Sequence, residues 1–119
     1  MTLKECFDNL QADYTGVMGR LMSEERVIRF LGKFVEEPSF GVLVEALESK
    51  NYEEAFRASH NLKGVCQNLG ISKLGEVSSE LCEELRNGEP AHDITPLVEQ
   101  VKEEYEHTIC ALKKLVEEA

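Results

Sequence analysis

The residues with the clearest chemical potential are His60 and Lys63, in the segment 55–69, which reads AFRASHNLKGVCQNL. At about 100° per residue in a helix, the small and apolar side chains of this segment gather on one arc, which must face a core. They are Ala55, Ala58, Ser59, Leu62, Val65, Cys66 and Leu69. His60 lies roughly 150° from the centre of that arc, so we expect its imidazole to point into solvent near mid-helix.

Four residues share the surface of His60 in this helix: Phe56, Lys63, Gly64 and Gln67. A glycine inside a helix costs about 1 kcal/mol relative to alanine, and no core packing on that side accounts for Gly64. Its missing side chain would let the backbone of a partner approach the imidazole. Phe56 is expected to be an exposed aromatic residue, as on a docking surface. The local charge of this face is expected to come from Lys63.

This arrangement suits phosphoryl transfer. A solvated imidazole is largely neutral at neutral pH, which leaves one ring nitrogen free to attack phosphorus. Lys63 would place a positive charge close to the developing phosphohistidine. An in-line approach to phosphorus needs room, which an open helix face provides more easily than a pocket. The simpler interpretation is that His60 is an ordinary surface residue without chemistry.

Composition describes the domain that must carry these residues. The chain has 119 residues, with 13 basic and 23 acidic side chains and a formal net charge of −10. The length fits one domain over residues 1–119. The negative charge argues against nucleic acid or an anionic membrane as a partner. The N-terminus, MTLKECFDNLQADY, does not resemble a signal peptide, and no apolar run is long enough to span a membrane. We therefore expect a cytoplasmic, monomeric domain.

The cysteines offer no obvious metal or catalytic pair. The four cysteines, Cys6, Cys66, Cys82 and Cys110, lie far apart and form no CxxC motif. Two disulfides are formally allowed, but the absence of a secretion signal favours buried free thiols. Cys66 falls on the core arc and His60 on the opposite side, which argues against a Cys–His nucleophile pair and hydrolase chemistry.

Glu104 and His107 match half of the paired Glu-x-x-His pattern of di-iron bundles. The other match, Glu89 and His92, flanks a proline in a segment that ends a helix, so no regular helix presents both side chains inward. We therefore expect no metal site. The paired glutamates along the chain, Glu83-Glu84 among them, are expected to be solvated helix faces.

Nearly every segment has helical periodicity, and none alternates as a strand would. Cap signals stand at Thr2 with Glu5, at Ser23, at Asn51 with Glu54, and at Ser72, and Pro96 is expected at the first position of the last helix. Gly70 is expected to end the helix that carries His60. The expected helices cover residues 3–10, 17–22, 24–35, 40–47, 52–69, 72–85 and 95–116. The short connections between the last three favour an all-α fold: an up-down antiparallel four-helix bundle with short additional N-terminal helices.

The motif His60-Asn61-Leu62-Lys63-Gly64, with Ala58 before it and Leu69-Gly70 after it, resembles the His-x-x-Lys-Gly signature of histidine phosphotransfer (HPt) domains. The resemblance extends from Asn51 to Leu85. It implies a four-helix bundle in which His60 is the phosphoacceptor, Lys63 gives electrostatic support and Gly64 gives clearance. The implied partners are response-regulator receiver domains and a hybrid sensor kinase. Magnesium would belong to the receiver, so no cofactor is expected in this chain.

The sequence departs from the family pattern at two positions. Gln67 stands where members usually carry a small residue, and Cys82 stands where some members carry a glutamine that orients the histidine. The chain has no ATP-binding or kinase motif, so the resemblance implies a phosphoryl carrier rather than a turnover enzyme. The alternative is a non-catalytic adaptor that binds receiver or kinase domains through Phe56, Gly64 and Gln67. The donor, the acceptor and the direction of flux stay open.

Overall fold

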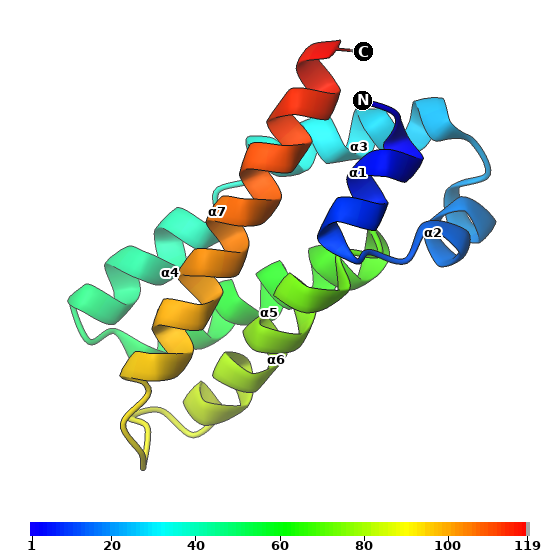
Figure 1. Cartoon of the computed structure of the whole chain (residues 1–119). Coiled ribbons are helices and arrows are strands. Elements are labelled where there is room, and N and C mark those ends of the chain that lie inside the picture. Colours follow the sequence, from blue (N-terminus) through cyan, green and yellow to red (C-terminus); the bar gives the residue numbers. More distant parts are fainter. Residues whose placement is uncertain (119) are drawn as a thin grey trace.

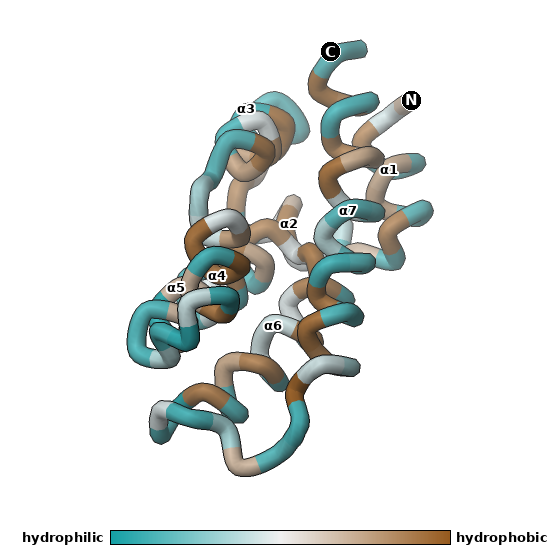
Figure 2. The backbone as a smooth tube through the Cα atoms, turned by 90° about the vertical axis from the view of Figure 1, so that its left-hand side faces the viewer, coloured by the Kyte–Doolittle hydropathy of each residue, from teal (hydrophilic) through white to brown (hydrophobic). Residues whose placement is uncertain are grey.

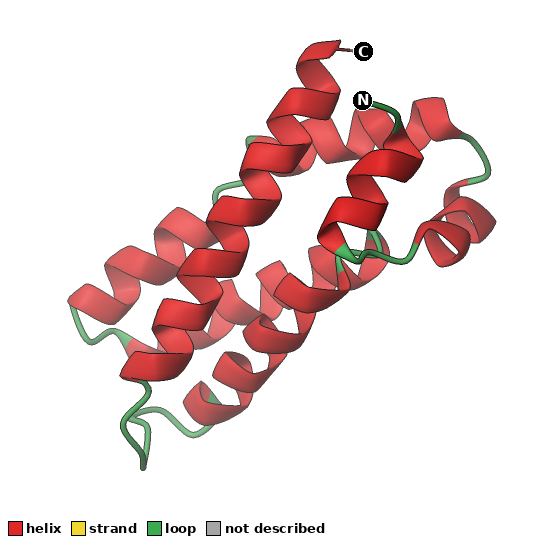
Figure 3. Cartoon of the chain, viewed as in Figure 1, coloured by secondary structure: helices red, strands yellow, loops and turns green. Residues whose placement is uncertain are grey.

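Every regular element in residues 1–118, the range that the computed structural model describes, is an α-helix (Figures 1 and 3). The helices are α1 (Leu3–Leu10), α2 (Tyr14–Leu21), α3 (Glu24–Val35), α4 (Ser39–Glu48), α5 (Tyr52–Asn68), α6 (Ser72–Leu85) and α7 (Thr95–Glu118). No strand occurs within this range. The predicted all-α helical bundle is confirmed.

Helix α5 lies at the centre of the packing, between α4 and α6, and α7 lies along α6 (Figure 1). The rings of Phe40 on α4 and Tyr105 on α7 stack with their centroids 3.8 Å apart, which joins the two outer helices. The C-terminal part of α7 packs instead against the N-terminal helices, where Gly32 of α3 faces Val116. Figure 2 shows hydrophobic and hydrophilic residues alternating along the helices, as amphipathic packing around one core requires.

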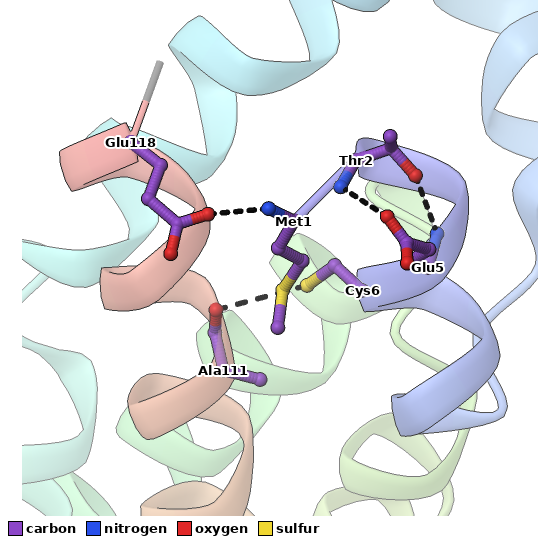
Figure 4. Close-up of polar contacts among 6 residues, drawn as sticks. All are labelled: Met1, Thr2, Glu5, Cys6, Ala111 and Glu118. Carbon is purple, nitrogen blue, oxygen red and sulfur yellow. Dashed lines mark hydrogen bonds and ion pairs between the residues drawn. The ribbon is translucent and has the colours of Figure 1, made fainter.

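The N-terminal helix is attached to the end of α7 by polar contacts (Figure 4). The Cys6 thiol donates a hydrogen bond of 3.8 Å to the carbonyl of Ala111, and the N-terminal ammonium pairs with Glu118. The two ends of the described chain therefore lie together, away from the middle of α5.

Three of the predicted helix caps are confirmed. The side chains of Thr2, Ser23 and Asn51 each accept a hydrogen bond from the backbone N–H three residues further along. At Thr2 the Glu5 carboxylate also accepts from the Thr2 N–H, which completes a capping box (Figure 4).

The turn between α5 and α6 needs glycine. Gly70 has a φ of +72°, and a Cβ there would lie 2.8 Å from the carbonyl oxygen of Asp13. The Ile71 N–H donates to the Cys66 carbonyl at 2.9 Å and the Gly70 N–H to the Gln67 carbonyl at 3.4 Å, which is a Schellman end. The predicted stop at Gly70 is confirmed, and α6 begins two residues later.

Three predicted helix starts are wrong in detail. Helix α2 begins at Tyr14 rather than at Val17, because the Asp13 side chain caps it by accepting from the Gly16 N–H at 3.0 Å. Ser72 does not cap α6: it is the first helical residue, and its hydroxyl donates to the Gly70 carbonyl at 3.3 Å. The tight turn leaves only Ile71 as the flanking residue. Helix α7 begins at Thr95, so Pro96 is its second residue rather than its first.

The cysteines are all free, and three of them, Cys6, Cys66 and Cys82, are buried as predicted. Cys110 contradicts the prediction, because it lies on the solvent side of α7 and is exposed. Burial raises the pKa of the Cys66 thiol to about 12, so this group stays protonated and unreactive in the folded chain.

Thiol labelling with a disulfide reagent tests this core. At mildly alkaline pH without denaturant, we expect rapid modification of Cys110 alone, with the remaining thiols reacting only after unfolding. Cys110→Ser should remove the rapid phase. A second rapid thiol in that variant would show that the core around α5 and α6 opens readily.

Candidate functional site

His60 occupies the middle of α5, and its side chain is exposed, as the helical pattern predicted. The opposite side of the same helix is closed: Ala55, Ala58, Ser59, Leu62 and Cys66 are buried. The buried Ser59 hydroxyl has its hydrogen-bond partner within the same helix, since it donates to the Phe56 carbonyl at 2.9 Å. Within residues 1–118 no side chain hydrogen-bonds the imidazole. Both ring nitrogens are therefore free for an incoming group.

Gly64, one turn after His60, borders open space. A Cβ built at this position meets no atom within 4 Å, so nothing in the fold requires a glycine there. The φ of Gly64 is not positive either, which removes a backbone reason for glycine. The absent side chain leaves clearance beside His60 at the expense of helix propensity.

Alanine at Gly64 should therefore stabilise the protein. We expect Gly64→Ala to raise the free energy of unfolding by about 1 kcal/mol, since alanine is the better helix former and its methyl group meets no neighbour. Chemical denaturation measures this. Gly75→Ala in α6 is the matched control: its methyl group would lie 3.3 Å from the Cβ of Cys66, so it should destabilise. A destabilised Gly64→Ala would show that this glycine is needed for packing.

Phe56 belongs to the same face but is less open than predicted. The side chain is half-buried and packs against the core, and its ring centroid lies 6.1 Å from that of His60. The guanidinium of Arg86, at the end of α6, lies 5.4 Å from the centre of the Phe56 ring. This distance is in the range of a cation–π contact. Phe56 is therefore partly covered by a charged neighbour rather than exposed as a free aromatic surface.

Lys63 is not the sole source of charge at the site, and the prediction that it would be is wrong. Arg86 forms two contacts with Glu83 on α6, at 2.6 and 3.1 Å. The Arg86 guanidinium, with a smaller contribution from Lys63, holds the pKa of the Glu83 carboxyl below its ordinary value. Arg86 and, more weakly, Lys63 therefore both stabilise the charged form of the Glu83 carboxyl, and Arg86 does so while lying over Phe56 of α5.

Arg86 and Glu83 are the residues that sequence reasoning missed. Glu83 was expected to be only a solvated acidic residue; it is exposed, but it is bound to Arg86. The signal was the short turn at Gly70, which forces α6 to run back along α5. Because Phe56 lies 14 residues before Gly70 and Arg86 lies 16 residues after it, their side chains meet.

The two departures from the family pattern lie in different environments. Gln67 is exposed near the end of α5, where its backbone carbonyl accepts from Arg20 at 3.1 Å. It also lines a groove of about 460 Å³ between α2, α5 and α6. Cys82 is fully buried in α6.

The other two histidines lie outside α5. His92 lies 3.4 Å from Glu84 and is exposed, and His107 is exposed on α7. No group of three or more His, Cys, Asp or Glu side chains within the described range is placed to hold a metal ion. No helix among residues 1–118 is both long enough and apolar enough to cross a membrane.

A helical bundle that presents an open histidine at mid-helix, with a lysine and a bare glycine one turn away, defines a class of protein: the histidine phosphotransfer domains. A family model described as the Hpt domain matches residues 36–118, and the chain belongs to this family. The matched range contains α4, α5, α6 and α7. Membership implies a phosphotransfer role in a phosphorelay, a setting in which the family works with receiver domains and kinases. Comparisons with curated proteins and with solved structures found no match.

Proposed function

We propose that this protein carries a phosphoryl group on His60 between the aspartates of response-regulator receiver domains. The observation that supports this proposal most directly is the open space beside Gly64 and His60, since a receiver must bring an aspartyl phosphate into line with the ring. The proposal also draws on the family membership of residues 36–118.

The transfer needs only groups that the two partners hold. The lone pair of one imidazole nitrogen of His60 forms a bond to phosphorus while the bond between phosphorus and the aspartyl oxygen breaks. The carboxylate of the receiver leaves with the electron pair of that bond. The other ring nitrogen keeps its proton until solvent removes it. The reverse reaction returns the phosphoryl group to a second receiver, and magnesium is supplied by the receiver.

Lys63 supports the transferred group electrostatically. It is half-buried on α5, and its positive charge already acts on Glu83 across the helix pair. A phosphoryl group on His60 would bring negative charge to the same region, which the ammonium would stabilise. Lys63 therefore favours the phosphorylated state of His60.

Transfer from a labelled receiver tests the role of His60. Incubated with a phosphorylated receiver domain and magnesium, the wild-type protein should acquire label as an acid-labile phosphoramidate, and His60→Gln should acquire none. His107→Gln is the matched control, because His107 is also exposed on a helix, and it should accept label normally. Equal labelling of His60→Gln would overturn the proposal. Receiver binding without transfer by the wild type would identify an adaptor that binds through Phe56, Gly64 and Gln67.

The role of Lys63 predicts a smaller effect. Lys63→Gln should lower the equilibrium share of label on His60 by about fivefold, the upper range for one exposed charge pair. Lys63→Arg should keep most of it, because the charge remains. Lys73→Gln, which removes an exposed lysine from α6, is the control and should behave as wild type. The titration of label against receiver concentration measures all three, and an unchanged Lys63→Gln would contradict the electrostatic role.

A further inference from the structure

Arg86 is placed at the site by contacts with two helices. It follows the last residue of α6, and its guanidinium lies 5.4 Å from the Phe56 ring centre on α5. The Phe56 ring in turn lies 6.1 Å from the His60 ring. An arginine side chain can move over such distances by changing rotamers alone, so the guanidinium is within reach of a group bound to His60.

Glu83 currently occupies the hydrogen-bonding edge of Arg86. Its two carboxylate oxygens accept from Nε at 3.1 Å and from Nη2 at 2.6 Å. This is the paired geometry with which arginine also binds phosphate oxygens. Both partners are exposed, so the pair is weak and can be exchanged.

The charges around His60 favour that exchange. A phosphoryl group carries close to two negative charges at neutral pH, against one for the carboxylate of Glu83. Lys63 also acts on Glu83 and would remain beside it when Arg86 leaves. Arg86, Lys63 and Glu83 thus sum to one positive charge before phosphorylation, which attracts the incoming phosphoryl group.

We propose that Arg86 binds the phosphoryl group carried by His60, and that Glu83 holds the guanidinium until that group arrives. This inference rests on the proposed role of His60 as phosphoacceptor. Arg86 exchanges one anionic partner for another, and no covalent bond changes in this step. Arg86 is then the residue that sets the ionisation of the phosphoryl group, and Glu83 is the positioning residue that competes for it.

A titration of the phosphorylated protein tests the inference without a receiver. Potassium phosphoramidate serves as the donor: an imidazole nitrogen bonds to phosphorus, the donor's own nitrogen–phosphorus bond breaks, and ammonia leaves. Phosphorus NMR then follows each phosphohistidine against pH. His60→Gln, His92→Gln and His107→Gln assign the signals. The phosphoryl group on His107 of α7 is the internal reference; the one on His92 is not used as a reference, because the His92 ring lies 3.4 Å from Glu84, two residues before Arg86.

The dianionic phosphoryl group should be stabilised only on His60. We expect its titration midpoint to lie below that of the phosphoryl group on His107. Arg86→Met should raise the midpoint by about 0.7 pH unit, a fivefold change in proton affinity, and Arg86→Lys should raise it less. Glu83→Gln should lower it, because the competing carboxylate is gone. These shifts should shrink at high salt.

Arg29→Met is the matched control variant. Arg29 is an exposed arginine of α3 that pairs with Glu25 at 3.9 Å, so its loss should leave the midpoint unchanged. Circular dichroism checks that each variant keeps its helices. An Arg86→Met midpoint equal to that of the wild type would overturn the inference, as would a failure of phosphoramidate to load His60.

The two proposals fail in different ways. A shifted midpoint in Arg86→Met together with no transfer from receiver domains would overturn the relay function and leave the binding role of Arg86 intact. Normal transfer from receivers with an unshifted midpoint would overturn the role of Arg86 alone.

Discussion

The close packing of α5 against α6 is the constraint on which the site depends. Two glycines make it achievable: Gly70 turns the chain with a positive φ, and Gly75 lets α6 approach Cys66 on α5. Side chains at either position would push the helices apart or distort the turn. Because the connection is so short, the register of α6 along α5 follows from the turn itself.

That register determines which charges meet His60. The buried side of α5 is made of small residues, including Ala58 and Ser59, so α6 lies close enough for its end to reach the exposed side. Glu83 and Arg86 arrive there, and Phe56 provides an aromatic surface for the guanidinium. A chain with a formal net charge of −10 thereby places the Arg86 guanidinium over Phe56, the aromatic neighbour of its exposed histidine. The overall charge describes the solvated faces and not the site.

Many of the helix ends follow from residues that are close together in the sequence. Caps at Thr2, Ser23 and Asn51 and the stop at Gly70 each depend on residues within a few positions of one another. The failures are of another kind. The predicted cap at Ser72 is wrong because the tight turn makes Ser72 the first helical residue and leaves Ile71 in the capping position. Cys110 is exposed because the rotation of α7 is set by its neighbours rather than by its own sequence.

The sequence by itself determined the side of α5 on which His60, Lys63 and Gly64 lie, because helical periodicity places side chains around an axis with no other information. It also determined the family, through the motif around His60 and the match over residues 36–118. Only the tertiary structure decided that Arg86 covers Phe56 while it stays paired with Glu83. The physical reason is that contacts between helices depend on how each helix is rotated about its axis and how closely the pair packs, which no single segment encodes.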